Sequence, residues 1–514
     1  MFGEVIKMKM WQGLCCVMIT GLVSVSCFEE SLEEEASTGG SQPSANTFTV
    51  SSTDDVVWLG VYDRPTQSNA PAGEVGSGYV AYTLSGVGTG QAKKRMPSLK
   101  PSVISWSQHR YTFAARLLPE VKNDDVGCLG GCAEGEYCLR QLCSDSHELL
   151  LLQGEAVTVQ GKLQRTYPTE LGDLDLVLVV DSDLSADDIA SAESAASSFA
   201  SELGRVAGLI GMAGSSDLTD FNGDGRLYIV VTNKTAGALG PDTIGWFNPH
   251  DWSSDADSNG ADILWLRPGG VDSLAQQVGT LIHEYFHLAL FSKRSAEGAS
   301  EPEALWLDEA MAHALEDFSG WGSSNVVTLE EGLAGFSETA LASGDDTLAQ
   351  RGIGYTFIRH LVDARARDSG LTSADDSRIS DSVEWLYSNV MNSTARGWNH
   401  APLSALTDAS IRGWLESVLG ASGGYLEVGT SAAGQSIGLD PYGQYASAEG
   451  FDVYLEGPQF EDLGALDGAY EGFVPESGWN VLQVSGLEPG TYTPALEMSS
   501  GREGVLVIMP GGLE

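Results

Sequence analysis

Short runs of alternating apolar and polar residues, separated by Gly, Pro and Ser, dominate the chain from residue 47 to residue 168. Residues 56–61 and 78–82 are examples. Alternation with a period of two turns one face of a strand toward a core and the other toward solvent. Short strands at this spacing predict a β-rich, sandwich-like domain over residues 47–168.

The pattern changes at residue 169 and returns after residue 420. Between these points, continuous apolar runs such as residues 174–180 predict buried strands, and stretches such as residues 273–291 have helical periodicity. Strands mixed with long helices predict an α+β domain over residues 169–420. A second β-rich domain is expected over residues 421–514.

The first 27 residues have the features of an export signal. Lys7 and Lys9 precede an apolar run at residues 13–25, and small residues lead to Cys27. This order defines a signal peptide. Cys27 stands where bacterial lipoproteins carry a lipidated cysteine, so we expect a lipid-anchored envelope protein at an outer membrane or cell surface, with plain secretion as the alternative. The acidic, Ser- and Gly-rich residues 28–46 then form a tether.

Four of the seven cysteines lie close together, at Cys128, Cys132, Cys138 and Cys143. An even number of cysteines in an exported chain predicts two disulfides, and three pairings are open. They would close a long loop of the first β-rich domain. A zinc knuckle is the other interpretation, which an oxidising compartment disfavours.

The formal charge is strongly negative, because 27 Lys and Arg stand against 71 Asp and Glu, giving −44. Binding to phosphate groups needs clustered Lys and Arg, so the charge excludes nucleic acid as the main partner. It equally excludes an anionic membrane surface, and we expect membrane attachment only through Cys27.

The segment His283-Glu284-Tyr285-Phe286-His287 carries the clearest chemistry of the sequence. Its two histidines are four residues apart in a strongly helical stretch, so both imidazoles lie on one helix face and can reach one ion. Glu284 lies at the flank of that face, where it can accept a proton without binding the ion. The alternative is a pair of core histidines on a buried helix.

A third metal ligand makes the metal interpretation stronger. Metzincins would need a histidine within ten residues, and residues 288–297 contain none. Glu309 follows His287 by 22 residues, on a helix that Pro302 opens and that can turn back along the first. Glu309 is therefore the predicted third ligand of Zn²⁺. His313 is a further candidate ligand or a neighbour of one, and Glu316 is expected to orient a ligand histidine.

Three segments resemble the hyicolysin-type gluzincin peptidases: HEYFH, the stretch Trp306-Leu307-Asp308-Glu309, and residues 354–361. The similarity covers roughly residues 170–420. Departures from the family pattern occur at Asp308, Ala310 and His360, none of which removes a ligand or the base. The resemblance implies a zincin-like domain with a mixed sheet and two metal-bearing helices, and a zinc endopeptidase.

Related gluzincins use a tyrosine or histidine toward the oxyanion of the reaction, so the resemblance makes Tyr355 a candidate for that role. Core packing of an aromatic helix is the other interpretation of Tyr355. The substrate would be a protein or peptide outside the cytoplasm, and the sequence sets no oligomeric state. A non-catalytic surface lipoprotein that uses the zincin-like domain for binding or adhesion is the alternative function.

Two further features carry weaker expectations. Asp220, Asn222 and Asp224 have the spacing of the first half of an EF-hand loop, which allows a structural Ca²⁺ site, although an Asx-rich turn is the other interpretation. The strand at residues 261–266 precedes the HEYFH helix, and we expect it to pair with an extended substrate.

Overall fold

The computed structural model describes most of the chain after residue 47. The described residues are 48–51, 56–64, 79–86, 93–94, 132–133, 135–139, 142–151, 157–172, 174–212, 224–240, 243–252, 258–268, 273–322, 325–342, 344, 346–370, 376–419, 427–430, 436–438, 444–446, 452–454, 461–462, 469–499 and 502–510. The predicted signal peptide, the lipidation site at Cys27 and the tether lie outside them, as do Cys128, Asp220 and Asn222.

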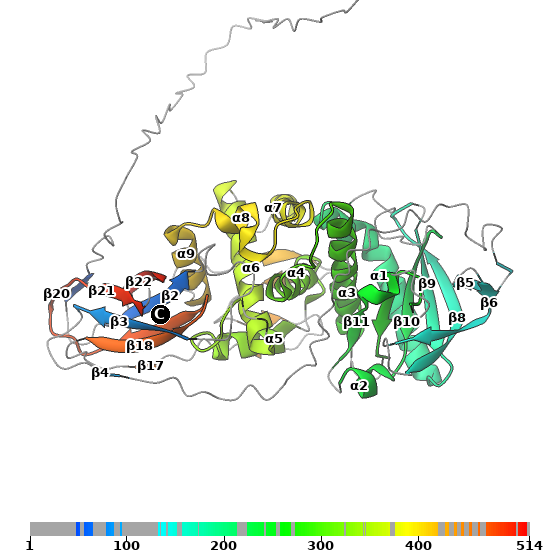
Figure 1. Ribbon diagram of the computed structural model, residues 1–514, viewed down its shortest axis with the longest axis horizontal. Helices are drawn as coiled ribbons and strands as arrows, with labels where there is room; N and C mark the ends of the chain where they lie inside the picture. The colour runs from blue at the N-terminus through cyan, green and yellow to red at the C-terminus, as the bar shows by residue number, and fades with distance from the viewer. Residues whose placement is uncertain are drawn as a thin grey trace, which may run out of the picture. The chain divides into compact units, whose positions relative to one another are not determined.

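A six-stranded mixed sheet packs against helix α3, which contains the predicted active-site segment (Figure 1). Its strands run in the order β11-β12-β10-β9-β8-β7. The three strands β9, β10 and β12 are parallel, while β7, β8 and β11 are antiparallel to their neighbours. The bounds are β7 Ser146–Leu150, β8 Thr158–Pro168, β9 Asp175–Asp181, β10 Arg226–Val231, β11 Gly245–Phe247 and β12 Ile263–Leu266.

The central strands are continuous apolar runs because both faces of the sheet are covered. In β9, Leu176 and Leu178 face one core, while Val177 and Val179 face another. The first core lies under α1 (Ala186–Leu209) and α3 (Leu274–Ala296). The mixed sheet with long helices confirms the predicted α+β class.

The second face of the sheet packs against a short hairpin, β5 (Tyr137–Leu139) with β6 (Leu142–Ser144). A disulfide between Cys132 and Cys143 ties this hairpin to the preceding chain. It is one pair among the four cysteines for which three pairings were open. The cysteine-containing segment was predicted to be a loop of the first β-rich domain, but its hairpin packs on the mixed sheet instead.

The helical part follows the sheet in sequence. Its helices are α4 Leu305–Phe318, α5 Asn325–Ala334, α6 Leu348–Asp368, α7 Asp376–Met391, α8 Ala401–Ser404 and α9 Asp408–Leu419, with the short α2 Thr235–Ala238 and the 3-10 turns Pro249–Trp252 and Gly397–Asn399. Among the described helices, none is both long and apolar enough to cross a membrane.

A buried ion cluster fixes the turn from α3 to α4. The Glu303 carboxylate lies 2.8 Å from Arg294 Nη1 at the end of α3 and 2.7 Å from His400 Nε2. It also accepts hydrogen bonds from the backbone N–H groups of Ala304 and Gly397. A buried charge is stable only when it is paired in this way. The cluster sets the direction in which α4 leaves α3, and with it the place of Glu309.

Strands from the two ends of the chain form one sandwich, which differs from the two separate β-rich domains predicted. In Figure 1 the blue strands β2 (Val57–Arg64) and β3 (Tyr79–Ser85) lie among orange and red ones. One sheet has the order β17-β19-β2-β22 and the other β21-β3-β18-β4. The remaining bounds are β1 Phe48–Val50, β4 Lys93–Lys94, β13 Glu427–Thr430, β14 Ser436–Gly438, β15 Gln444–Ala446, β16 Asp452–Tyr454, β17 Glu461–Asp462, β18 Tyr470–Pro475, β19 Trp479–Val484, β20 Gly490–Tyr492, β21 Ala495–Met498 and β22 Glu503–Pro510.

The division expected at residue 168 also differs from the structure. Strands β7 and β8, assigned to the first β-rich domain, pair with β9 in the mixed sheet. The reason is that alternation along a strand shows which of its faces is buried, but not which strand lies beside it.

Candidate metal centre

Helix α3 presents the HEYFH segment inside the protein. Ser273 caps the helix, its Oγ accepting a hydrogen bond from the Gln276 backbone N–H at 3.2 Å. His283 and Glu284 are both buried. One helical turn separates His283 from His287, and their ring centroids lie 4.7 Å apart. The two imidazoles are therefore neighbours on one face, as the spacing predicts.

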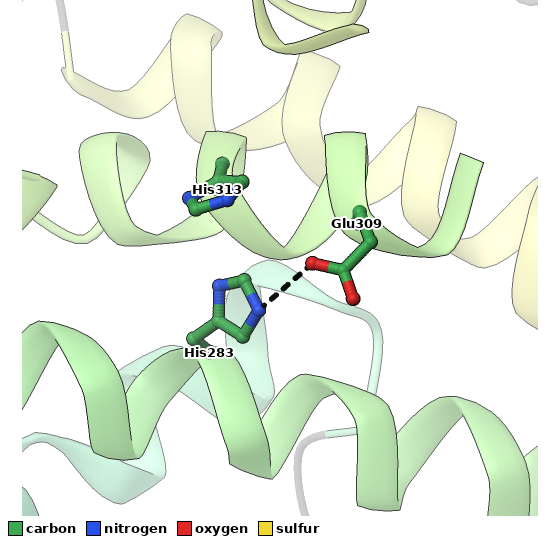
Figure 2. A group of neighbouring side chains, drawn as sticks. All are labelled: His283, Glu309 and His313. Atoms are coloured by element: carbon green, nitrogen blue, oxygen red, sulfur yellow. Dashed lines mark ion pairs between the residues drawn. The ribbon is translucent and has the colours of Figure 1, made fainter. Parts of the chain in front are cut away.

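Glu309, from α4, lies against both imidazoles. His283 Nε2 is 3.3 Å from Glu309 Oε2, the pair that the dashed line marks in Figure 2. His287 Nε2 is 3.7 Å from Glu309 Oε1. Both predicted histidine ligands thus turn Nε2 toward the carboxylate of Glu309. The α3–α4 arrangement inferred from the sequence brings them together.

Each of these histidines is held from behind by a carboxylate. The Nδ1 atom of His283 lies 2.8 Å from Glu316 Oε1, and that of His287 lies 2.7 Å from Asp308 Oδ1. A carboxylate on Nδ1 keeps the proton there and leaves the Nε2 lone pair for a metal. The sequence pointed to Glu316, but the role of Asp308 was missed. Its position next to Glu309 on α4 was the available signal.

His313 forms a second combination with the same two residues. His283, Glu309 and His313 make a buried group that could hold a metal ion (Figure 2). The Nδ1 atom of His313 donates to Asn325 Oδ1 at 2.8 Å and lies 3.1 Å from Glu316 Oε1. Its Nε2 atom is buried and has no hydrogen-bond partner among the described residues.

The contacts of His287 differ from those of His313. His283 and His313 both turn Nδ1 toward the same oxygen of Glu316. His287 instead faces Glu309 with Nε2 and has its own carboxylate on Nδ1. This is the arrangement found around metal-bound imidazoles.

Carboxylates and basic groups shift one another's pKa values in this group. Burial alone would raise the pKa of Glu309, but Arg351 and the two histidines outweigh it and hold that pKa well below its ordinary value. Burial likewise would lower the pKa of His283, but hydrogen bonds with Glu309 and Glu316 raise it well above its ordinary value. Without a metal, protons on the histidines therefore balance the carboxylates.

We expect zinc to bind more tightly as the pH rises. Zinc needs the neutral imidazole, and the pKa values of His283 and His287 are both raised in the metal-free protein. Protons compete with zinc below these raised values, so affinity should increase by about tenfold per pH unit for each proton displaced. Titrations between about pH 6 and pH 8, in buffers of different ionisation enthalpy, measure the affinity and the protons released. A pH-independent affinity would contradict the assignment of these ligands.

The Glu316 carboxylate offers a test of how the ligands are held. Burial alone would raise its pKa, but hydrogen bonds with His283 and His313 lower that pKa to about 2. Glu316→Gln keeps the shape and removes the charge, so zinc affinity should fall by about 10- to 100-fold. The exposed Glu330→Gln of α5 is the matched control. Equal zinc affinity in both variants would rule out this role of Glu316.

Tyr355 lies away from this chemistry. It is fully buried, and its hydroxyl donates to Asp317 Oδ2 at 2.8 Å. Asp317 also pairs with Arg359 in the same buried cluster. The structure thus accounts for Tyr355 by core packing, the other interpretation that the sequence allowed.

The expectation that residues 261–266 pair with substrate is wrong. Strand β12 is bonded to β10 on one side and to β11 on the other, so both of its edges are used. In the described part of the sheet, β11 is the outer strand beside α3. A Cβ at Gly245, the first residue of β11, would lie 2.6 Å from Glu284 Oε1 and 2.4 Å from Thr280 Cγ2. Strand β11 therefore runs directly past the Glu284 carboxylate.

The close approach of β11 predicts the effect of Gly245→Ala. The added methyl group must displace the Glu284 carboxylate or the strand, and a shift of about 1 Å in a reacting group can cost about 100-fold in rate. We expect any peptide hydrolysis to fall by about 10- to 100-fold with zinc affinity unchanged. Gly237→Ala, where a Cβ meets nothing within 4 Å, is the control. Unchanged hydrolysis would show that Glu284 is not confined by β11.

Two of the three residues of the predicted calcium site lie outside the part of the chain that the structure describes. Asp224 is described, and its Oδ2 accepts a hydrogen bond from the Tyr228 hydroxyl at 2.7 Å. Asp220 and Asn222 lie outside the described residues.

Comparison with known proteins identifies no family: no protein-family model and no curated protein matches this sequence.

Proposed function

We propose that this chain is a zinc-dependent peptidase that hydrolyses extracellular or envelope proteins. One observation carries the proposal. His283 and His287 face Glu309 with Nε2 while separate carboxylates hold their Nδ1 atoms, and Glu284 follows His283 on α3. The export signal and Cys27 support a place of action outside the cytoplasm.

The donor set fits Zn²⁺. Two imidazoles and one carboxylate are the ligands of many catalytic zinc sites, which keep one position open. The two carboxylates of Glu309 and Glu316 that raise the pKa of His283 also suit a dication. Zinc bound by His283, His287 and Glu309 would supply a Lewis acid that polarises the scissile carbonyl and lowers the pKa of water.

Glu284 provides the acid–base step. Burial raises the pKa of Glu284, and the neighbouring histidines work against that rise. A carboxylate with a raised pKa is a better proton acceptor near neutral pH. Glu284 takes a proton from the attacking water while the water oxygen bonds to the scissile carbon. Glu284 then passes that proton to the amine nitrogen as the C–N bond breaks.

Strand β11 supports a way of binding the substrate. It is the outer strand of the mixed sheet in the described residues, and Gly245 at its start approaches Glu284. An extended peptide can add to such an edge through main-chain hydrogen bonds, with little demand on its sequence. The scissile bond would then lie beside Glu284.

Metal removal and replacement test the proposal. The purified mature protein should contain one zinc per chain and hydrolyse members of a broad peptide library. A chelator should abolish hydrolysis, and added zinc should restore it. If the protein binds zinc fully but cleaves no peptide in the library, the domain serves binding or adhesion and the peptidase proposal fails.

A further inference from the structure

A cation beside the candidate ligands has no part in the proposed reaction so far. Arg351, on α6, places Nη1 3.0 Å from Glu309 Oε2. Asp346 holds the other side of the same guanidinium, with Nε donating to Oδ1 at 2.6 Å and Nη2 donating to Oδ2 at 2.9 Å. The guanidinium is thus fixed in position next to the third ligand.

The Arg351 guanidinium has more donors than Asp346 uses. An arginine carries five N–H groups, and Asp346 accepts from two of them, while the contact with Glu309 is an ion pair. The Arg351 side chain is 24% exposed, compared with 8%, 13% and 10% for His283, His287 and Glu309. The guanidinium is therefore more accessible than the ligands, and it can offer N–H groups to an incoming acceptor.

The paired hydrogen bonds to Asp346, here called the clamp, fix the orientation of the Arg351 guanidinium. Asp346 has φ 51°, a left-handed conformation that a non-glycine residue adopts at a cost in energy. Its backbone N–H donates to Gln350 Oε1 at 2.8 Å, which holds the strained residue in place. Neutralising Glu309 would need only a nearby positive charge. A bidentate clamp on a planar guanidinium instead fixes the direction of its remaining donors.

We propose that Arg351 is a catalytic residue that binds the scissile carbonyl oxygen of a peptide and stabilises the negative charge that develops there. The inference rests on the proposed peptidase function. The position of Nη1 next to Glu309 favours an oxygen close to the ligand group over one at a distant end of the substrate. Fixed donors aimed at developing charge are among the strongest contributions to acyl-transfer catalysis. Arg351 thus takes the part that the resemblance suggested for Tyr355.

The test measures binding without turnover. A blocked peptide phosphonamidate, a tetrahedral anion, is titrated calorimetrically into zinc-saturated wild type, Arg351→Ala, Arg351→Lys and the control Arg365→Ala, an exposed arginine of the same helix. Arg351→Ala should bind the phosphonamidate about 100- to 1000-fold more weakly, and Arg351→Lys should recover only part of the loss. Zinc affinity, measured separately, should change less than about threefold, a limit well below the loss expected from a residue that orients a ligand.

Different failures point to different errors. If Arg351→Ala loses zinc affinity tenfold or more while the zinc-saturated protein binds the phosphonamidate normally, Arg351 only positions Glu309 and the inference is overturned. Should Arg351→Ala not fold, Asp346→Asn keeps the guanidinium and releases its clamp, and unchanged phosphonamidate affinity there would equally overturn it. If wild type binds the phosphonamidate through Arg351 but cleaves no peptide, the peptidase proposal fails, and Arg351 keeps only the part of a group that binds a tetrahedral anion beside the metal ligands.

Discussion

Glu284→Gln should bind zinc as tightly as wild type and lose nearly all peptide hydrolysis. Glutamine has the size of glutamate but cannot accept the proton of the attacking water. General acid–base catalysis contributes about 100- to 10,000-fold, and kcat/KM should fall by that amount. Glu284 lies at the flank of the helix face that carries His283 and His287 and is not one of the predicted metal ligands, so the zinc content should not change.

The control for this variant is Glu297→Gln, at the end of the same helix, where the side chain is 39% exposed and pairs with Lys293. Kinetics on one cleaved peptide and metal analysis of each protein supply the data. Full hydrolysis by Glu284→Gln would remove the general base from the mechanism. Loss of zinc from Glu284→Gln would instead make Glu284 a ligand, and the division of roles would be wrong.

Replacing His287 should abolish tight zinc binding, whereas replacing His313 should not. In His287→Ala the site keeps only His283 and Glu309, and loss of one of three ligands should weaken zinc binding by far more than the 10- to 100-fold typical of an outer partner. His313→Ala removes a neighbour of Glu316, and we expect a loss of about tenfold or less. Competition with a chromogenic chelator measures both affinities.

The opposite order is the result that would count against this ligand set. If His313→Ala loses zinc and His287→Ala retains it, the metal lies with His283, Glu309 and His313, the other combination that the structure allows. Equal retention by both variants would leave the imidazole of His283 as the sole histidine ligand. Circular dichroism of each metal-free variant separates loss of zinc from loss of fold.

The site could be predicted from the sequence where its residues are set by local helix geometry. His283 and His287 share a helix face because of their spacing alone. To place Glu309 beside them, the prediction required only that the second helix turn back along the first. The role of Asp308 was not predicted. The comparison with the hyicolysin-type pattern marked Asp308 only as a departure, and this gave no indication that it contacts His287. Arg351 was hidden because its contact with Glu309 joins two helices that lie far apart in the sequence.

The fold divides in the same way. The buried strand β9 was evident as an apolar run, and the start of α1 is set locally by the capping box of Ser185 and Asp188. The pairing of β2 with β19 and β22 was not evident, since partners more than 400 residues apart leave no local pattern. The sequence therefore located the strands but divided the sandwich between two domains.

Anomalous diffraction at the zinc absorption edge, from crystals of the zinc-saturated protein, tests the central claim most directly. The account predicts a single strong peak within bonding distance, about 2.0–2.2 Å, of His283 Nε2, His287 Nε2 and a Glu309 carboxylate oxygen. A peak bound by His313 in place of His287, or a peak that none of these residues touches, would contradict it.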